Sequence, residues 1–105
     1  MVSKDNDIAR LIRLRISQID PKAEVILYGS RARGDARANS DWDVLILTDY
    51  PTDLKQESIF RDDLYELELQ TGESFSVFAY SKSEWHGKQS ITPFYGNVSR
   101  EGIAL

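Results

Sequence analysis

Apolar residues recur at helical spacing in the first twenty positions of the chain. They lie three or four residues apart, at Ile8, Leu11, Ile12, Ile16 and Ile19. This period predicts an amphipathic helix over residues 5–19 that packs one face on a core. Asp5 or Asn6 is suited to cap its start, and Pro21 follows its end.

Three short apolar runs have the length and composition of strands. They cover residues 24–28, 42–47 and 74–80, and the last is rich in aromatic and β-branched residues. The first run ends at the turn Gly29-Ser30, and the second ends before Pro51. These boundaries predict strands that are buried in a sheet.

Further helices are predicted between and after these strands. A long one spans residues 53–70, with Gly72 just beyond its end. Its inward positions are Ile59 or Phe60, Leu64 and Leu67. Ser81 and Glu84 form a capping box for a short helix around Trp85, and a last helix runs from about Pro93 to Ile103.

The predicted order is α-β-α-β-α-β-α, where the second helix is a short one. Strands that alternate with helices indicate an α/β (α+β) fold in which helices cover a small sheet. The long helix between the second and third strands makes those two parallel and adjacent. The connection after the first strand is too short for a crossover, so we expect a mixed sheet of about three main strands within a single domain, residues 1–105.

Composition limits the classes of function. The chain has 105 residues, 41% of them hydrophobic, no cysteine, and a net charge of −4. Thiolate metal sites are excluded, and an acidic chain is not expected to bind nucleic acid directly. No apolar run approaches bilayer length and the N-terminus has no signal segment, so we expect a cytoplasmic protein with no membrane partner. Arg31, Arg33 and Arg37 form either a solvated loop or a local site for a small anion such as a triphosphate.

Two Asp-x-Asp pairs in the sequence call for different interpretations. Asp5 and Asp7 lie at a helix start, where carboxylates are favoured for structural reasons. Asp41 and Asp43 open a strand, so both side chains point to one face, with Cα atoms about 6–7 Å apart. Two carboxylates at that spacing can converge on Mg²⁺ or Mn²⁺, which complete their coordination with water and substrate phosphates.

The turn Gly29-Ser30 ends the first strand and opens a short helix that Gly34 terminates. Glycine lets the backbone approach a ligand closely, and a serine hydroxyl with helix-start N–H groups suits a phosphate. The turn and the two acids together would form a site for a metal and a nucleotide.

Gly29-Ser30, ten residues, then Asp41-x-Asp43 resembles the signature of the DNA polymerase β-like nucleotidyltransferase superfamily. The chain is most similar to its shortest members, the minimal nucleotidyltransferases (MNT proteins). The resemblance implies the nucleotidyltransferase fold and Mg²⁺-dependent transfer of a nucleoside monophosphate, usually AMP from ATP. It implies that Asp41 and Asp43 are the catalytic metal ligands and that Gly29, Ser30 and Arg33 bind the nucleotide.

One position departs from the family pattern. Active members usually carry a third carboxylate on the next strand, between apolar residues. That slot, between Phe75 and Val77, holds Ser76. Serine does not replace a carboxylate as a ligand or as a base. The residues that could supply the third carboxylate instead are Glu73, Glu66 and Glu68. Glu66 and Glu68 lie on the predicted long helix and are interpreted as solvated side chains.

Two functions from different classes follow from the resemblance. The first is an enzyme that modifies a protein or RNA acceptor, as the antitoxin of a toxin–antitoxin pair with a HEPN-domain protein. The alternative is a catalytically weak or inactive antitoxin of the same fold that acts by binding its partner. Modification of small molecules, as by aminoglycoside nucleotidyltransferases, is disfavoured because the chain has no room for a substrate domain. Either function allows a homo- or hetero-oligomer.

Aromatic residues near the C-terminus have two interpretations. Trp85, Phe94 and Tyr95 belong either to the core or to a partner surface. His86 lies in a polar setting and is interpreted as a surface residue.

Overall fold

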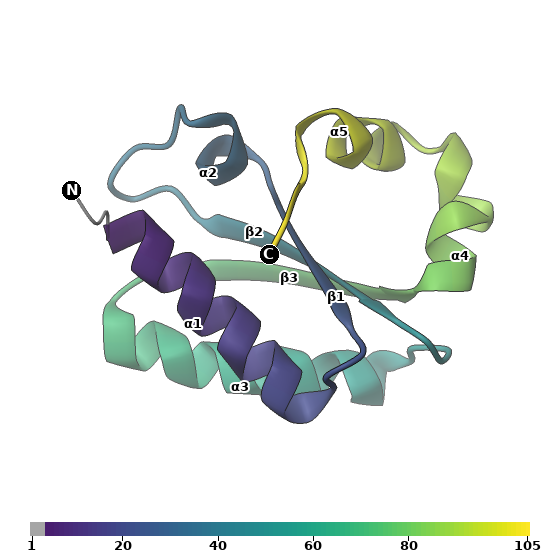
Figure 1. Cartoon of the computed structure of the whole chain (residues 1–105), viewed down its shortest axis with the longest axis horizontal. Coiled ribbons are helices and arrows are strands. Elements are labelled where there is room, and N and C mark those ends of the chain that lie inside the picture. Colours follow the sequence, from purple (N-terminus) through teal and green to yellow (C-terminus); the bar gives the residue numbers. More distant parts are fainter. Residues whose placement is uncertain (1–3) are drawn as a thin grey trace.

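The computed structural model describes residues 4–105, with side chains from Asn6 onward. Helices and strands alternate in the predicted order (Figure 1). The elements are α1 (Lys4–Ile19), β1 (Glu24–Tyr28), α2 (Ser30–Arg33), β2 (Trp42–Thr48), α3 (Leu54–Thr71), β3 (Phe75–Ser81), α4 (Lys82–His86), a 3₁₀ helix (Lys88–Ile91), α5 (Pro93–Glu101) and β4 (Ile103–Ala104).

The described residues form a mixed sheet with the strand order β3-β2-β1-β4. β2 and β3 are parallel and adjacent, as predicted, and β1 is antiparallel to β2. The prediction missed β4, which pairs with β1 and makes the sheet four-stranded. The last helix therefore ends at Glu101, earlier than predicted, and Gly102 is already extended, with φ of −66° and ψ of 141°. A two-residue strand with exposed side chains is too short to produce a period in the sequence.

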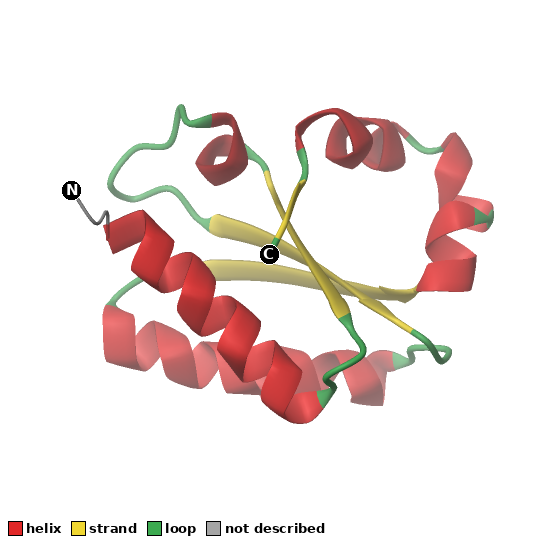
Figure 2. Ribbon diagram, in the orientation of Figure 1, coloured by secondary structure: helices red, strands yellow, loops and turns green. Residues whose placement is uncertain are grey.

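Helices cover both faces of the sheet, so the structure has three layers (Figure 2). On β2, the alternate residues Trp42, Val44 and Ile46 pack into a core with α1 and α3. Leu45 and Leu47 point to the opposite face, where they pack with Trp85 and Val98 of α4 and α5. Burial on both faces explains the unbroken apolar run in β2.

Helix α3 has the predicted ends and inward face. The Asp53 side chain accepts a hydrogen bond of 2.8 Å from the Gln56 backbone N–H, and Gly72 ends the helix in the left-handed region. Phe60 is buried and Ile59 is 43% exposed, which decides between the two alternatives. Leu64 and Leu67 are buried as predicted.

Helix α1 begins at Lys4, so Asp5 and Asn6 lie inside its first turn rather than at its cap. That part of the prediction was wrong, because a helix boundary is the least certain feature of a periodic pattern. Asp7 is exposed and lies 4.0 Å from Arg10 across one turn. The side chain of Asp5 lies outside the described part.

The C-terminal aromatic residues belong to the core between the sheet and helices α4 and α5, which contains Leu45 and Leu47. Trp85 is buried, and its ring lies 5.3 Å from Phe94 and 5.0 Å from Tyr95. The Ser81 hydroxyl caps α4 by accepting from the Glu84 backbone N–H at 3.0 Å. His86 is exposed, as predicted, and its Nδ1 lies 3.0 Å from the Tyr95 hydroxyl.

No helix within residues 4–105 is both long enough and apolar enough to cross a bilayer.

Candidate nucleotide-binding and transfer site

The turn after β1 is packed directly against the second aspartate of the pair. Tyr28, the last residue of β1, is paired with Asp43 at the start of β2. Gly29 follows with φ of +75°, and a Cβ atom there would lie 2.1 Å from Oδ2 of Asp43. Only glycine satisfies both the conformation and the contact. Ser30 then opens α2, and Gly34 ends it with φ of +85°.

Asp43 alternates along β2 with Trp42, which is buried on the opposite face, so its side chain lies on the face of the sheet that α4 and α5 cover. Asp41 lies one residue before β2, near enough to Asp43 for its charge to act on that carboxyl. Asp41 is exposed and Asp43 is half-buried. Burial raises the pKa of Asp43, the charges of Asp41 and Glu101 raise it further, and Arg33 lowers it.

This electrostatic environment suits a cation. The charges that disfavour ionised Asp43 are those that a divalent ion would neutralise. The donors are hard oxygen atoms, which fit Mg²⁺ or Mn²⁺. In the described part of the chain, no group of three or more acidic, histidine or cysteine residues is placed to hold a metal. Mg²⁺ in proteins is commonly held by one or two carboxylates together with water and substrate phosphates, so the donor chemistry of Asp41 and Asp43 is compatible with such an ion.

The three arginines after the turn have separate environments. Arg33, on α2, donates to Asp35 at 3.1 Å and to Glu101 at 2.7 Å. Its side chain is half exposed and lies on α2, the short helix that follows the turn. Arg37 lies in the exposed loop that follows α2.

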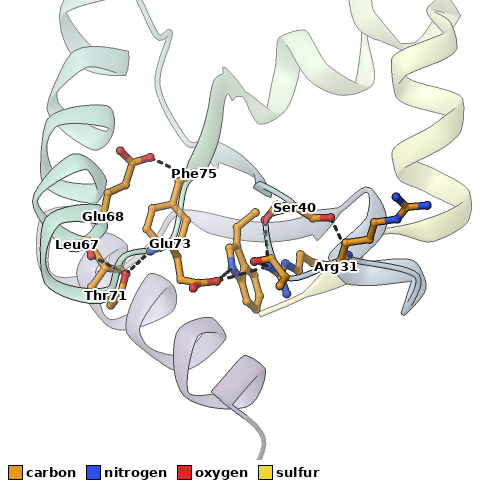
Figure 3. A network of polar contacts seen from close by, with 10 residues as sticks. Arg31, Ser40, Leu67, Glu68, Thr71, Glu73 and Phe75 are labelled. Atoms are coloured by element: carbon orange, nitrogen blue, oxygen red, sulfur yellow. Dashed lines mark hydrogen bonds and ion pairs between the residues drawn. The ribbon is translucent and has the colours of Figure 1, made fainter.

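Arg31 has a structural role in a buried polar network (Figure 3). Its side chain is 8% exposed, donates to the backbone oxygen of Ser40 at 3.0 Å, and lies 3.5 Å from Glu73. The guanidinium also stacks over the Trp42 ring, 4.8 Å from its centre. Arg31 thus ties α2 to the starts of β2 and β3. The interpretation of all three arginines as one solvated loop or anion site was wrong for Arg31.

The glutamates named as substitutes for a third carboxylate are engaged elsewhere. Glu73 accepts from the Trp42 indole N–H at 2.9 Å and pairs with Arg31. Glu66 is exposed and lies 3.7 Å from Arg15. Glu68 is half-buried rather than solvated, because the end of α3 faces the start of β3 and its carboxylate accepts from the Phe75 N–H at 2.6 Å.

Ser76 occupies the predicted slot. It is the β3 residue paired with Asp43, so both side chains leave the sheet on the same face. The neighbour of Asp43 on β3 is therefore a hydroxyl and not a carboxylate.

Two side chains close to Asp43 were not predicted from the sequence as members of the site. Glu101, at the end of α5, pairs with Arg33 and adds negative charge near Asp43. Tyr28 is half-buried, and burial and the charge of Asp43 raise its pKa, so its phenol stays protonated. Glu101 lies 58 residues after Asp43 in the chain, so no spacing signal connects them.

Gly29→Ala is expected to lower the free energy of unfolding by about 1–3 kcal/mol and to displace Asp43. The new methyl group would have to occupy the position of Oδ2. Urea denaturation and calorimetric titration with Mg²⁺–ATP measure the two effects. Gly34→Ala is the matched control, since Gly34 also has positive φ but has no atom within 4 Å of a Cβ. Equal nucleotide binding by both variants would contradict the prediction.

Comparison with known proteins places this geometry in a family. A protein-family model described as "Nucleotidyltransferase domain" matches residues 9–92. A solved structure named "Structure of putative minimal nucleotidyltransferase" is similar at 21% identity and a TM-score of 0.66, over 99% of this chain and 98% of that one. A toxin–antitoxin structure with AMP-PNP is similar at 20% identity and a TM-score of 0.62, over 97% of this chain and 72% of that one. A mutant of the toxin–antitoxin pair MntA–HpeT is similar at 18% identity and a TM-score of 0.61, with the same coverage.

No match was found among curated proteins. At these identities the solved structures establish the shared fold, and the family model covers most of the chain. The chain belongs to the nucleotidyltransferase domain family.

Proposed function

We propose that this protein transfers a nucleoside monophosphate, AMP from ATP in the first instance, to a protein or RNA acceptor. We propose further that it acts in the cytoplasm as the antitoxin of a toxin–antitoxin pair with a HEPN-domain partner. The observation that carries the transfer proposal is the packing of Gly29 against Asp43, with the charge of Asp41 acting on the same carboxyl. The similar toxin–antitoxin structures, one of them with AMP-PNP, support a nucleotide substrate and a toxin partner, and the HEPN identity of that partner rests on the family resemblance alone.

Each residue of the site has a defined task in this proposal. Gly29 lets the turn pack directly against the Asp43 carboxylate, and Ser30 and Arg33 would offer a hydroxyl and a guanidinium to the oxygen atoms of a triphosphate. Asp41 and Asp43 would hold Mg²⁺, which when bound neutralises phosphate charge and aligns the reacting oxygen atoms.

In the transfer itself, an acceptor hydroxyl oxygen forms a bond to the α-phosphorus of ATP. The bond from that phosphorus to the bridging oxygen breaks, and pyrophosphate leaves with the electron pair. Because Ser76 cannot accept the hydroxyl proton, this proton passes to water. Without a positioned base the reaction is expected to be slow.

The alternative is an antitoxin that binds its partner without chemistry. Ser76 beside Asp43 favours it, as does the engagement of Glu73 and Glu66 in other contacts. Nucleotide binding and transfer are separate measurements, so the two functions can be distinguished.

Calorimetric titration with ATP tests the nucleotide site. We expect binding in the presence of Mg²⁺ and a loss of affinity in EDTA, because the carboxylates repel phosphate unless a cation intervenes. The double variant Asp41→Asn with Asp43→Asn is expected to lose the Mg²⁺ dependence. Binding that neither EDTA nor the double variant changes would refute the proposed site.

Asp7→Ala is expected to leave nucleotide binding unchanged and to alter the free energy of unfolding by less than about 1 kcal/mol. Asp7 belongs to an Asp-x-Asp pair, but its contact is an exposed ion pair with Arg10 on α1. Calorimetry and urea denaturation provide both measurements. Impaired ATP binding by a folded Asp7→Ala protein would mean that the two pairs had been assigned to the wrong roles.

A further inference from the structure

A groove of about 480 Å³ runs along the outer edge of β3, which is an edge strand of the sheet. Its walls come from β3 and from the side of α3 that faces this edge, and its lining residues include Asp41, Arg61, Tyr65, Glu68, Ser76 and Phe78. We call this the β3 groove. The site described above uses only two of these residues, Asp41 and Ser76.

The strand order sets the position of the β3 groove relative to the reaction. The nucleotide turn follows β1, the aspartates open β2, and the groove lies on β3, so the turn and the groove are on opposite sides of the aspartates. Phosphoryl transfer requires the attacking and leaving oxygen atoms roughly in line. If pyrophosphate leaves over Gly29 and Ser30, the attacking hydroxyl arrives from the β3 side.

We infer that the β3 groove is the docking surface for a polypeptide segment with basic and aromatic side chains, which carries the acceptor hydroxyl to Asp41 and Asp43. The inference rests on the proposed function, because it assigns the groove to the acceptor of that transfer. It selects a protein over an RNA acceptor and locates the surface that recognises it.

Charge determines the class of occupant. Arg61 is bonded to Glu57 at 2.9 Å and to the Val77 carbonyl at 3.1 Å, so its charge is already compensated. In the metal-free protein, the carboxylates of Asp41 and Glu68 leave the groove acidic, and Glu68 keeps its charge when a metal ion is held by Asp41. Phosphodiesters are repelled by such a surface, whereas lysine or arginine side chains are attracted.

Exposed aromatic rings supply the apolar part of the surface. Tyr65 on α3 is 58% exposed, and Phe78 on β3 is 42% exposed. Exposed aromatic side chains that are surrounded by charged groups are typical anchors of protein interfaces. Together with the carboxylates they match a segment that alternates apolar and basic groups.

Side chains cap the backbone edge of β3 and so decide how the segment docks. Glu68 and Glu57 accept from the N–H groups of Phe75 and Ala79 at 2.6 and 3.3 Å. Arg61 and Thr52 donate to the carbonyls of Val77 and Ala79 at 3.1 and 3.2 Å. Since these outward groups are engaged, the segment does not extend the sheet as an added strand; it packs on the side chains instead.

Nuclear magnetic resonance of the ¹⁵N-labelled full chain tests the inference without metal or nucleotide. The probe is a capped hexapeptide of alternating lysine and tyrosine, compared with its glutamate–tyrosine counterpart and with hexauridylate RNA. We expect the lysine peptide to shift the amide signals of Tyr65, Ser76 and Phe78, and the two anionic probes to have no effect there.

Two variants and a matched control define the surface. Tyr65→Ala is expected to weaken binding of the lysine peptide by about fivefold or more, as for an interface anchor. Glu68→Gln keeps an oxygen acceptor for the Phe75 N–H but removes the charge, and is expected to weaken binding as well. Leu69→Ala is the control, because Leu69 is 70% exposed on the same helix and does not line the groove.

The outcomes separate this inference from the proposed function. Equal or tighter binding of hexauridylate, signal shifts confined to other surfaces, or equal effects of Tyr65→Ala and Leu69→Ala would each overturn the groove assignment. If the protein binds Mg²⁺–ATP but does not respond to the lysine peptide, the assignment of the β3 groove is refuted and the proposed nucleotide site is still supported. A response to the peptide in a protein that does not bind Mg²⁺–ATP supports the docking surface and refutes the proposed transfer.

Discussion

Asp43→Asn is expected to reduce transfer of AMP by on the order of 10²–10³-fold, the loss typical of removing one preorganised electrostatic group from an active site. Asn retains the shape of the side chain and its contact with Gly29, but not the negative charge that holds a cation against the triphosphate. The measurement is incorporation of ³²P from α-labelled ATP into a co-purified partner or into the protein itself.

The same substitution is expected to stabilise the metal-free protein at neutral pH. Burial and the charges of Asp41 and Glu101 raise the pKa of Asp43 in the folded state above its unfolded value. Ionisation of this carboxyl therefore favours unfolding at pH values above the raised pKa, and Asn removes that penalty. The gain is fully present above the raised folded-state pKa and disappears as the pH falls below the unfolded-state pKa, where both states bind the proton.

Thermal unfolding in EDTA at pH 7 and pH 3 measures this effect. A higher Tm for Asp43→Asn at pH 7, combined with loss of transfer, shows that the loss does not come from unfolding. A lower Tm at pH 7 would mean that Asp43 stabilises the fold, and full transfer activity in the variant would remove Asp43 from the reaction.

Ser76→Asp is expected to increase AMP transfer by roughly 10²–10⁴-fold, the contribution typical of a positioned general base. Ser76 is paired with Asp43 and shares its face of the sheet. A carboxylate there stands on the side from which the acceptor hydroxyl is proposed to approach. It would take the hydroxyl proton that otherwise passes to water.

The added charge has a cost in the absence of metal. A third carboxylate next to Asp43 repels the existing ones, so Ser76→Asp is expected to unfold at a lower temperature in EDTA and to regain stability when Mg²⁺ is added. Ser83→Asp on α4 is the matched control, since it adds the same charge at an exposed position away from the site.

Three results of this comparison are informative. A rise in transfer for Ser76→Asp alone establishes the missing base as the limit on the reaction. Efficient transfer by the wild type that Ser76→Asp does not improve would show that another group already accepts the proton. No transfer by any variant, with partner binding intact, would favour the antitoxin that acts by binding.

Local patterns in the sequence were sufficient for most of the fold. The periods of 3.6 and 2 residues identify elements by the faces they bury, so α1, α3 and the three longer strands lie within a few residues of their predicted bounds. Alternation along a strand also led to the prediction that Asp41 and Asp43 share one face, and Asp43 lies within β2 with Asp41 just before it. The long helix between β2 and β3 required a parallel pair, and this pairing brought Ser76 beside Asp43.

What the tertiary structure alone decided depends on contacts between residues far apart in the chain. The pairing of β4 with β1, the approach of Glu101 to Arg33 and the enclosure of Arg31 by Glu73 and Trp42 join segments with no common period or spacing. The β3 groove likewise exists only because α3 packs along an edge strand. The sequence gives the chemical identity of each side chain. The packing of the helices and strands decides which groups surround that side chain, and therefore its charge environment and its role.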